Sequence, residues 1–265
     1  MKIGIVGCGG RMGRMLVNAV LETEGCTLAG GTERVGSDGI GRDLGELVGR
    51  GTLGCMVDDD PSRLFEVADA VIDFSAPAAT VLHASLAADT RTALIVGTTG
   101  LAAEDETQLK IAATRTPLVY APNYSVGVNL LLALTEQAAA ILADDYDIEI
   151  VEMHHRHKVD APSGTALGLG RAAAKGCGVA LDRVWCKARD GHPGARPKGE
   201  IGFATLRGGD VVGDHTVIFA AEGERLELGH KASSRAVFAR GAVRAARWTH
   251  GKAPGLYTMR DVLGL

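Results

Sequence analysis

The chain has 265 residues, and its 28 Lys and Arg residues against 32 Asp and Glu residues give a formal net charge of −4 at pH 7. Hydrophobic residues make up 46% and charged residues 23%, which is typical of a soluble globular protein that needs no disulfides to fold. The mild acidity argues against binding to nucleic acid or to a membrane surface, and five widely spaced cysteines without a CxxC pair favour a reduced, cytoplasmic chain over a secreted one.

The first 120 residues alternate short β-rich runs with helical segments. Helices are expected after the first strand, where five apolar residues between Met12 and Val20 share one face, from Pro77, and after Gly100. Strands are predicted at residues 3–6, 26–29, 70–74, 93–96 and 118–120. This alternation predicts an α/β fold with a Rossmann-like parallel sheet and helices on both faces.

The pattern changes after Ser125. A helix is predicted over residues 126–143, ended by Asp144 and Asp145, then a strand over 147–153 and a helix over 163–175. Three closely spaced strand candidates at 201–206, 216–221 and 225–228 favour antiparallel pairing. A Gly-, Pro- and basic-rich stretch at 187–199 is expected to form a mobile loop. We therefore predict a first domain over 1–125, completed by 235–265, and a second α+β domain over 126–234 with a mostly antiparallel or mixed sheet.

A glycine cluster lies between the first predicted strand and the first predicted helix. Gly7, Gly10 and Gly13 read GxxGxxG rather than the common GxGxxG. A tight strand-to-helix turn alone also produces such a cluster, but glycines here let backbone N–H groups approach a pyrophosphate at the positive end of a helix. Glu33 follows 20 positions after Gly13, where a dinucleotide site carries its acidic residue. The pattern therefore predicts NAD(P) binding.

Glu33 and Arg34 bear on the choice of cofactor. A carboxylate at this strand end accepts hydrogen bonds from the adenosine ribose and favours NAD, whereas an adjacent Arg pairs with a 2′-phosphate and favours NADP. The sequence leaves NADH and NADPH open, and an exposed charge pair without a cofactor role is the alternative.

A cationic cluster follows the strand predicted at 147–153. Residues 154–158 read HHRHK, so three of the eight histidines and two further cations fall within five residues. Three interpretations compete: a metal site, which the nearby cations disfavour, a solvated polar loop, and a site where an imidazole protonates an anionic substrate. The next residues favour the third, because Ser163 is a good helix N-cap and N–H groups around Gly164 and Thr165 would form a carboxylate cradle. We therefore predict a small dicarboxylate substrate and no metal.

These features together resemble the 4-hydroxy-tetrahydrodipicolinate reductase (dihydrodipicolinate reductase) family over nearly the full length of the chain. The HHRHKVDAPSGTA run is the most specific part of the resemblance. The matching motifs are GCGGRMG from Gly7, Glu33-Arg34, DFS from Asp73, GTTG from Gly97, APNYS from Ala121, HHRHKVDAPSGTA from His154, IGFATLRGGDVVGDHT from Ile201 and HKASSR from His230.

The resemblance implies an oxidoreductase of lysine and diaminopimelate biosynthesis. It would use NADH or NADPH to reduce 4-hydroxy-tetrahydrodipicolinate/dihydrodipicolinate to tetrahydrodipicolinate, by hydride transfer and then protonation from His154. Lys158 would be a second catalytic residue, and His155, Gly164 and Thr165 would bind substrate. The first domain would bind the dinucleotide, and the second would bind substrate and form a homotetramer. The implied cofactor-binding residues are Gly7, Cys8, Gly9, Gly10, Arg11, Met12, Glu33, Arg34, Gly97, Thr98, Thr99, Ala121, Pro122, Asn123 and Tyr124.

Two other functions remain open at this point. Another NAD(P)-dependent amino-acid-pathway dehydrogenase, acting on aspartate or homoserine, would share the glycine cluster but would not need the cations followed by the cradle. A non-catalytic NAD(P)-binding sensor would bind the cofactor without oxidising it in the presence of dihydrodipicolinate.

Overall fold

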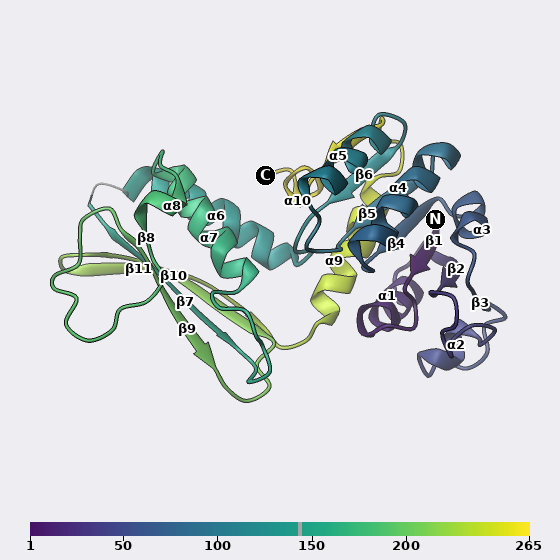
Figure 1. The fold of residues 1–265 in the computed structure, drawn as a ribbon, viewed down its shortest axis with the longest axis horizontal. Coiled ribbons are helices and arrows are strands. Elements are labelled where there is room, and N and C mark those ends of the chain that lie inside the picture. Colours follow the sequence, from purple (N-terminus) through teal and green to yellow (C-terminus); the bar gives the residue numbers. More distant parts are fainter. Residues whose placement is uncertain (143–144) are drawn as a thin grey trace. The chain divides into compact units, whose positions relative to one another are not determined.

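A computed structural model describes residues 1–142 and 145–265 of the chain. Contacts divide these residues into a first unit, Met1–Val126 with Arg235–Gly264, and a second unit, Gly127–Ser234 with Leu265 (Figure 1). Each unit has a sheet of its own.

The first unit contains a seven-stranded sheet in which neighbouring strands are parallel. Its strands are β1 (Lys2–Val6), β2 (Thr27–Thr32), β3 (Val57–Asp58), β4 (Ala70–Asp73), β5 (Ala93–Val96), β6 (Pro117–Tyr120) and β12 (Gly255–Tyr257). Their order across the sheet is β12-β6-β5-β4-β1-β2-β3, so the chain direction across the sheet reverses between β1 and β4. This doubly wound arrangement confirms the predicted Rossmann-like sheet.

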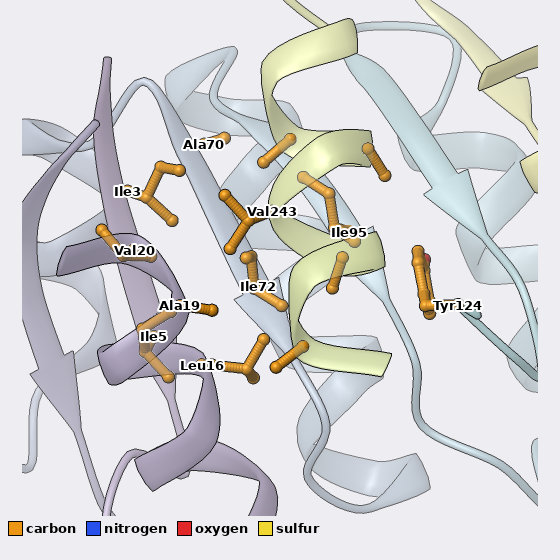
Figure 2. Packing of buried hydrophobic residues seen from close by; sticks show 14 of the residues in the cluster. Ile3, Ile5, Leu16, Ala19, Val20, Ala70, Ile72, Ile95, Tyr124 and Val243 are labelled. Atoms are coloured by element: carbon orange, nitrogen blue, oxygen red, sulfur yellow. The ribbon is translucent and has the colours of Figure 1, made fainter. Parts of the chain in front are cut away.

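Helices cover both faces of the first sheet. They are α1 (Arg11–Leu21), α2 (Leu44–Leu47), α3 (Pro61–Val67), α4 (Pro77–Thr90), α5 (Ala103–Ala112), α9 (Ala236–Trp248) and α10 (Met259–Leu263). Alternate strand residues point to opposite faces: Ile72 packs in the cluster with α1 and α9, and Val71 in the cluster with α3, α4 and α5. Figure 2 shows the first cluster, with Val243 of α9 over Ile72 and Ile95.

The second unit contains a mixed five-stranded sheet. Its strands are β7 (Asp147–His154), β8 (Trp185–Cys186), β9 (Ile201–Arg207), β10 (Gly213–Ala221) and β11 (Glu224–Ala232), in the order β11-β10-β7-β9-β8. The predicted antiparallel pairing is confirmed for β10 and β11. It is wrong for β9. Strand β7 lies between β9 and β10, so β9 pairs with β7 instead of β10, and β9 and β7 run parallel.

Helices α6 (Val126–Leu142), α7 (Gly164–Gly176) and α8 (Leu181–Val184) complete the second unit. Figure 1 shows α6 and α7 together on one side of the sheet, where Ile150, Phe203 and Val217 are buried. The helix predicted at 126–143 is found to Leu142, and residues 143 and 144, where it is predicted to end, lie outside the described residues. Within the described part of the chain, no helix is long and apolar enough to cross a membrane.

The segment 187–199 is tied to β7 by two arginines. Arg189 donates to both carboxylate oxygens of Glu149 at 2.9 Å, and Nε of Arg196 donates to Oε1 of Glu149 at 2.9 Å. Burial raises the pKa of Glu149, but these hydrogen bonds outweigh burial and the pKa lies below its ordinary value. The loop that composition predicts to be mobile is therefore anchored at two points.

Candidate active site

Four parallel strands of the first unit end side by side. Val6 of β1 pairs with Asp73 of β4, Asp73 with Val96 of β5, and Val96 with Tyr120 of β6. The loops after these strands therefore leave from one edge of the sheet. Ligands of doubly wound sheets bind at this edge, and it gathers the three predicted cofactor segments at 7–12, 97–99 and 121–124.

The loop between β1 and α1 has the shape that a pyrophosphate requires. Gly7 has φ +68°, a left-handed conformation that favours glycine. A Cβ at Gly13 would lie 2.6 Å from Cα of Cys8, so glycine is needed for α1 to pack against the loop. Gly10 is the N-cap of α1 and lacks a side chain to cap it, which leaves N–H groups of the first turn, where Arg11 and Met12 lie, for an anion. These residues fit a dinucleotide.

Cys8 faces the interior of the first unit. Its side chain is fully buried, and burial, with the nearby Glu33 charge, raises the pKa of its thiol to about 12. A Cβ at Gly31 on β2 would lie 2.9 Å from Sγ of Cys8. Cys8 is therefore a small, unreactive packing residue, and only its main chain could contact a cofactor.

Glu33 follows β2 directly and reaches back to the glycine loop. Its Oε1 accepts a hydrogen bond from the N–H of Gly9 at 2.8 Å, and its Oε2 accepts one from the N–H of Arg34 at 3.3 Å. The side chain of Arg34 is exposed. The predicted acidic residue thus stands beside the predicted pyrophosphate loop, where the ribose of a dinucleotide lies in this fold.

A buried polar cluster supports the loop at 97–100. Asp73 is fully buried and accepts hydrogen bonds from Oγ of Ser75 at 2.5 Å and from Nδ1 of His83 at 2.8 Å. Thr98 Oγ1 donates to Asp73 at 3.3 Å and accepts from Thr80 at 2.8 Å. Burial raises the pKa of Asp73, but the hydrogen bonds outweigh it and the pKa lies below its ordinary value. The Thr98 hydroxyl therefore holds the loop, while Gly97 is half-buried and Thr99 is exposed.

The segment after β6 divides between the core and the surface. Ala121 and Tyr124 are buried, Asn123 is half-buried and Pro122 is exposed. The Tyr124 hydroxyl lies 2.9 Å from carbonyl oxygens of both β5 and β6, and Figure 2 shows Tyr124 as part of the core cluster. The side chain of Tyr124 therefore points away from a surface ligand, which the motif alone does not reveal.

His154 is the last residue of β7 in the second unit and is only 8% exposed. Its Nδ1 lies 2.6 Å from Oε2 of Glu152, which is 1% exposed. Arg207 of β9 pairs in register with His154 and donates two hydrogen bonds to Glu152, at 2.8 and 2.9 Å. The buried imidazole and carboxylate and the half-buried guanidinium form one cluster.

The same carboxylate contacts the start of α7. Oε1 of Glu152 accepts a hydrogen bond from the N–H of Ser163 at 3.1 Å. Oγ of Ser163 accepts one from the N–H of Ala166 at 3.2 Å, which confirms Ser163 as the N-cap. Gly164 is exposed and Thr165 half-buried in the first turn of the helix, whose N–H groups form the positive end of its dipole.

A second buried histidine lies beside His154. The ring of His215 on β10 is 5.0 Å from that of His154, and its Nε2 lies 3.0 Å from Oγ of Ser163. Burial, followed by the nearby charge of His154, lowers the pKa of His215 to about 4. Gly213, at the start of β10, leaves room beside the His154 ring, because a Cβ at this position would lie 3.0 Å from Nε2 of His154.

His155 and Lys158 lie on the turn after β7. The N–H of His155 donates to the carbonyl of Val211 at 2.7 Å. Nζ of Lys158 donates to Oδ1 of Asp160 at 2.8 Å, and the Lys158 side chain is 20% exposed. A positive side chain, a helix N-terminus and a carboxylate-bound imidazole thus belong to one end of the second unit, a combination suited to binding an anion and giving it a proton.

Sequence reasoning does not single out Glu152, Arg207 or His215. Glu152 does leave a signal, because it interrupts the apolar face that Ile148 and Ile150 begin in an alternating strand. Arg207 and His215 lie in the matching run that starts at Ile201, but the run alone gives them no role, because their places depend on which strands pair with β7. Among the described residues, no group of three or more His, Cys, Asp or Glu side chains is arranged to hold a metal ion.

Two family models match the chain. The model described as "Dihydrodipicolinate reductase, N-terminus" matches residues 1–124, and "Dihydrodipicolinate reductase, C-terminus" matches residues 127–263.

Curated relatives match along the same length. The 4-hydroxy-tetrahydrodipicolinate reductase of Ruegeria pomeroyi is 57% identical over 263 residues, covering 99% of this chain and 98% of that protein. The reductase of the same name from Magnetococcus marinus is 55% identical over 264 residues, covering 100% and 98%. A solved structure, the dipicolinate-bound dihydrodipicolinate reductase from Paenisporosarcina sp. TG-14, shares the fold with a TM-score of 0.77, 24% identity and 97% coverage of both chains.

Proposed function

The chain belongs to the dihydrodipicolinate reductase family, and we propose that it reduces 4-hydroxy-tetrahydrodipicolinate/dihydrodipicolinate to tetrahydrodipicolinate with NADH or NADPH, with His154 as the proton donor. The observation that carries the activity is the match to reductases at 55–57% identity along 99–100% of the chain. The reaction is a step of lysine and diaminopimelate biosynthesis.

The first unit would hold the dinucleotide. Support comes from the glycine loop after β1, from the carboxylate of Glu33 beside that loop, and from the loops that follow β5 and β6 at the same sheet edge. When bound, the reduced dinucleotide supplies a hydride. The chain's part is to bind its pyrophosphate at the N-terminus of α1 and to present the main chain of the 97–99 loop, which the Asp73 cluster holds in place.

The second unit would hold the dicarboxylate. N–H groups of Gly164 and Thr165 at the N-terminus of α7 would receive one carboxylate. His155 and Lys158 would receive the other, and the Lys158 ammonium group, 2.8 Å from Asp160, would also favour the negative charge that develops in the ring. Lys158 would also serve as a second proton donor.

His154 would supply the proton. Reduction of one double bond adds a hydride to one carbon of the conjugated ring and a proton to its neighbour, so the electron density left by the hydride needs an acid within reach. Support for His154 comes from its burial, its place at the end of β7, and the hydrogen bond that engages Nδ1. Nε2, on the Gly213 side of the ring, is then the nitrogen that gives the proton.

Loss of nicotinamide absorbance tests the activity and the donor together. The purified chain is mixed with freshly generated dihydrodipicolinate and offered NADH and NADPH in turn, and the wild type is expected to oxidise at least one. His154→Gln should lower kcat by about 10²–10⁴-fold with a modest change in KM, whereas His192→Gln, at an exposed position of the second unit, should not. Wild-type kcat in His154→Gln would remove His154 from the role. If the wild type binds the cofactor but does not oxidise it, the remaining function would be that of a non-catalytic NAD(P)-binding sensor.

We also propose a cytoplasmic homotetramer. Support for association comes from the sheet face opposite α6 and α7, where β7 carries the half-buried Val151 and Met153 and Leu206 of β9 is 49% exposed. Support for the location comes from five free cysteines, which are typical of a reducing compartment. Light scattering should give four times the 27.5 kDa mass of one chain, and Leu206→Glu should lower that mass. A wild-type mass of one chain would contradict the tetramer, and recovery of the protein outside the cytoplasm after cell fractionation would contradict the location.

A further inference from the structure

Both oxygens of the Glu152 carboxylate are engaged, each with a different part of the second unit. Oε2 accepts hydrogen bonds from Nδ1 of His154 at 2.6 Å and from Nη1 of Arg207 at 2.8 Å. Oε1 accepts from Nη2 of Arg207 at 2.9 Å and from the N–H of Ser163 at 3.1 Å. Four donors thus converge on a side chain that is 1% exposed, which is how an interior tolerates an ionised carboxylate.

The charge on Glu152 determines which nitrogen of His154 carries hydrogen. Burial raises the pKa of Glu152, but hydrogen bonds from Arg207 and then His154 outweigh burial, and the pKa lies below its ordinary value. An ionised carboxylate only accepts hydrogen bonds, so Nδ1 of His154 must donate. The proton that the imidazolium can release is then the one on Nε2, and the neutral ring that remains is the Nδ1–H tautomer.

The second oxygen determines where α7 begins. Residues 155–162 separate β7 from α7 without forming a helix or strand, and the hydrogen bond from Ser163 to Glu152 closes this segment across 11 positions. Ser163 is the N-cap, so the first turn with Gly164 and Thr165 follows directly from the residue that Glu152 holds. The distance between the imidazole and this first turn therefore depends on the Glu152 carboxylate, together with the contact between Oγ of Ser163 and Nε2 of His215 at 3.0 Å.

We propose that Glu152 is a positioning residue for the reaction: it reserves the Nε2 proton of His154 for transfer and fixes the N-terminus of α7 relative to that nitrogen. This inference rests on the function proposed above for His154 and for the first turn of α7. A carboxylate orients the catalytic histidine of serine proteases in the same way, and its replacement by the amide lowers kcat about 10⁴-fold through the wrong tautomer. Glu152 differs in that its other oxygen also holds the helix that would bind substrate.

Glu152→Gln separates the charge of this side chain from its shape, because the amide has one accepting oxygen and one donating nitrogen. If the NH₂ group replaces Oε2, it faces His154, whose Nδ1 must then accept, so the ring hydrogen moves to Nε2. If the NH₂ group replaces Oε1, it faces the N–H of Ser163, and two donors in contact displace the start of α7. Either orientation disturbs one half of the proposed arrangement, and in both the NH₂ group also faces an N–H of Arg207.

Two measurements besides turnover report on the tautomer of His154 and on the N-terminus of α7. Two-bond ¹H–¹⁵N spectra of histidine-labelled enzyme report the ring tautomer, and signals lost in His154→Asn identify His154. Binding of pyridine-2,6-dicarboxylate, which takes up no proton, reports the α7 end of the site. The wild type is expected to hold neutral His154 as Nδ1–H. In Glu152→Gln, kcat should fall about a hundredfold or more, together with a change to Nε2–H or a loss of dicarboxylate affinity.

Glu149→Gln is the matched control, because Glu149 lies on the opposite face of β7 and is also paired with two arginines; it should leave all three readouts unchanged. Wild-type kcat in Glu152→Gln, or a lower kcat with the tautomer and the dicarboxylate affinity both unchanged, would overturn the proposal. A wild-type His154 in the Nε2–H form would also overturn it, even if the variant fails to fold. If the wild type shows no turnover, the proposed function fails. The His154 tautomer and the dicarboxylate affinity, compared between the wild type and Glu152→Gln, still test whether Glu152 is a positioning residue.

Discussion

Acidification is expected to destabilise the second unit through His215. This imidazole is 4% exposed, and its surroundings, chiefly burial, lower its pKa to about 4, against about 6.5 in an unfolded chain. As the pH falls, the unfolded chain therefore takes up the proton first. The contribution of neutral His215 is fully present above pH ~6.5 and is lost as the pH falls from there toward ~4. The ionisable groups that face it are His154, Glu152, His230 and Lys158.

The size of the effect follows from the two pKa values. The difference between about 6.5 and about 4 corresponds to about 3 kcal/mol of unfolding free energy once the pH is below both. At pH 5 most of this difference is expressed, and His215 should lower the unfolding free energy by about 2 kcal/mol relative to pH 7. Burial also lowers the pKa of His230, which acts in the same direction, so His215 must be isolated by substitution. Glu152, whose pKa lies below its ordinary value, titrates in a lower pH range.

Urea unfolding of a single-tryptophan variant measures this loss. The chain has two tryptophans, and Trp248→Phe leaves Trp185 of β8 to report on the second unit. In this background the unfolding free energy should fall by about 2 kcal/mol more between pH 7 and pH 5 with His215 present than with His215→Gln. His192→Gln, at an exposed position, should keep the full loss. All variants are compared at one protein concentration, because association shifts stability. The same pH dependence with and without His215 would refute the low pKa.

Three further substitutions test separate parts of the arrangement. Gly213→Ala would place a Cβ 3.0 Å from Nε2 of His154 and should lower kcat about tenfold or more, whereas Gly229→Ala, with its nearest neighbour at 3.4 Å, should not; equal turnover in both would refute a reacting Nε2. Asp73→Asn should cost the first unit about 2–3 kcal/mol in calorimetric unfolding and weaken NADH binding, whereas the exposed Asp89→Asn should cost less than about 1 kcal/mol; equal losses would count against the buried cluster. Lys158→Ala should raise KM and lower kcat, and an unchanged kcat/KM would exclude it from the site.

The sheet of the first unit could be predicted where strands are buried on both faces. Such strands are continuous apolar runs, and β5 has the predicted bounds, while β4 ends one residue before the predicted end. The edge strands β3 and β12 have two and three residues. These strands are too short to show a periodic pattern of apolar residues. They form because β2 and β6 offer unpaired backbone groups, so the sequence itself hardly indicates them. The N-cap at Ser163 could be predicted because a cap is a local interaction between neighbours in the chain.

The places of Arg207 and His215 around His154 could not be predicted, because they depend on which strands lie beside β7. The predicted pairing of β9 is wrong for the same reason. An antiparallel pair of β9 with β10 would have left β7 without its parallel neighbour. In the structure β9 lies beside β7, and this register places Arg207 next to His154. A carboxylate on the apolar face of β7 would otherwise be a buried charge without a partner, at a cost of several kcal/mol. The guanidinium from β9 removes that cost, so Glu152 can remain ionised beside the imidazole. The crossover that local patterns miss is therefore the feature that allows the proposed acid–base site at the end of an otherwise apolar face of β7.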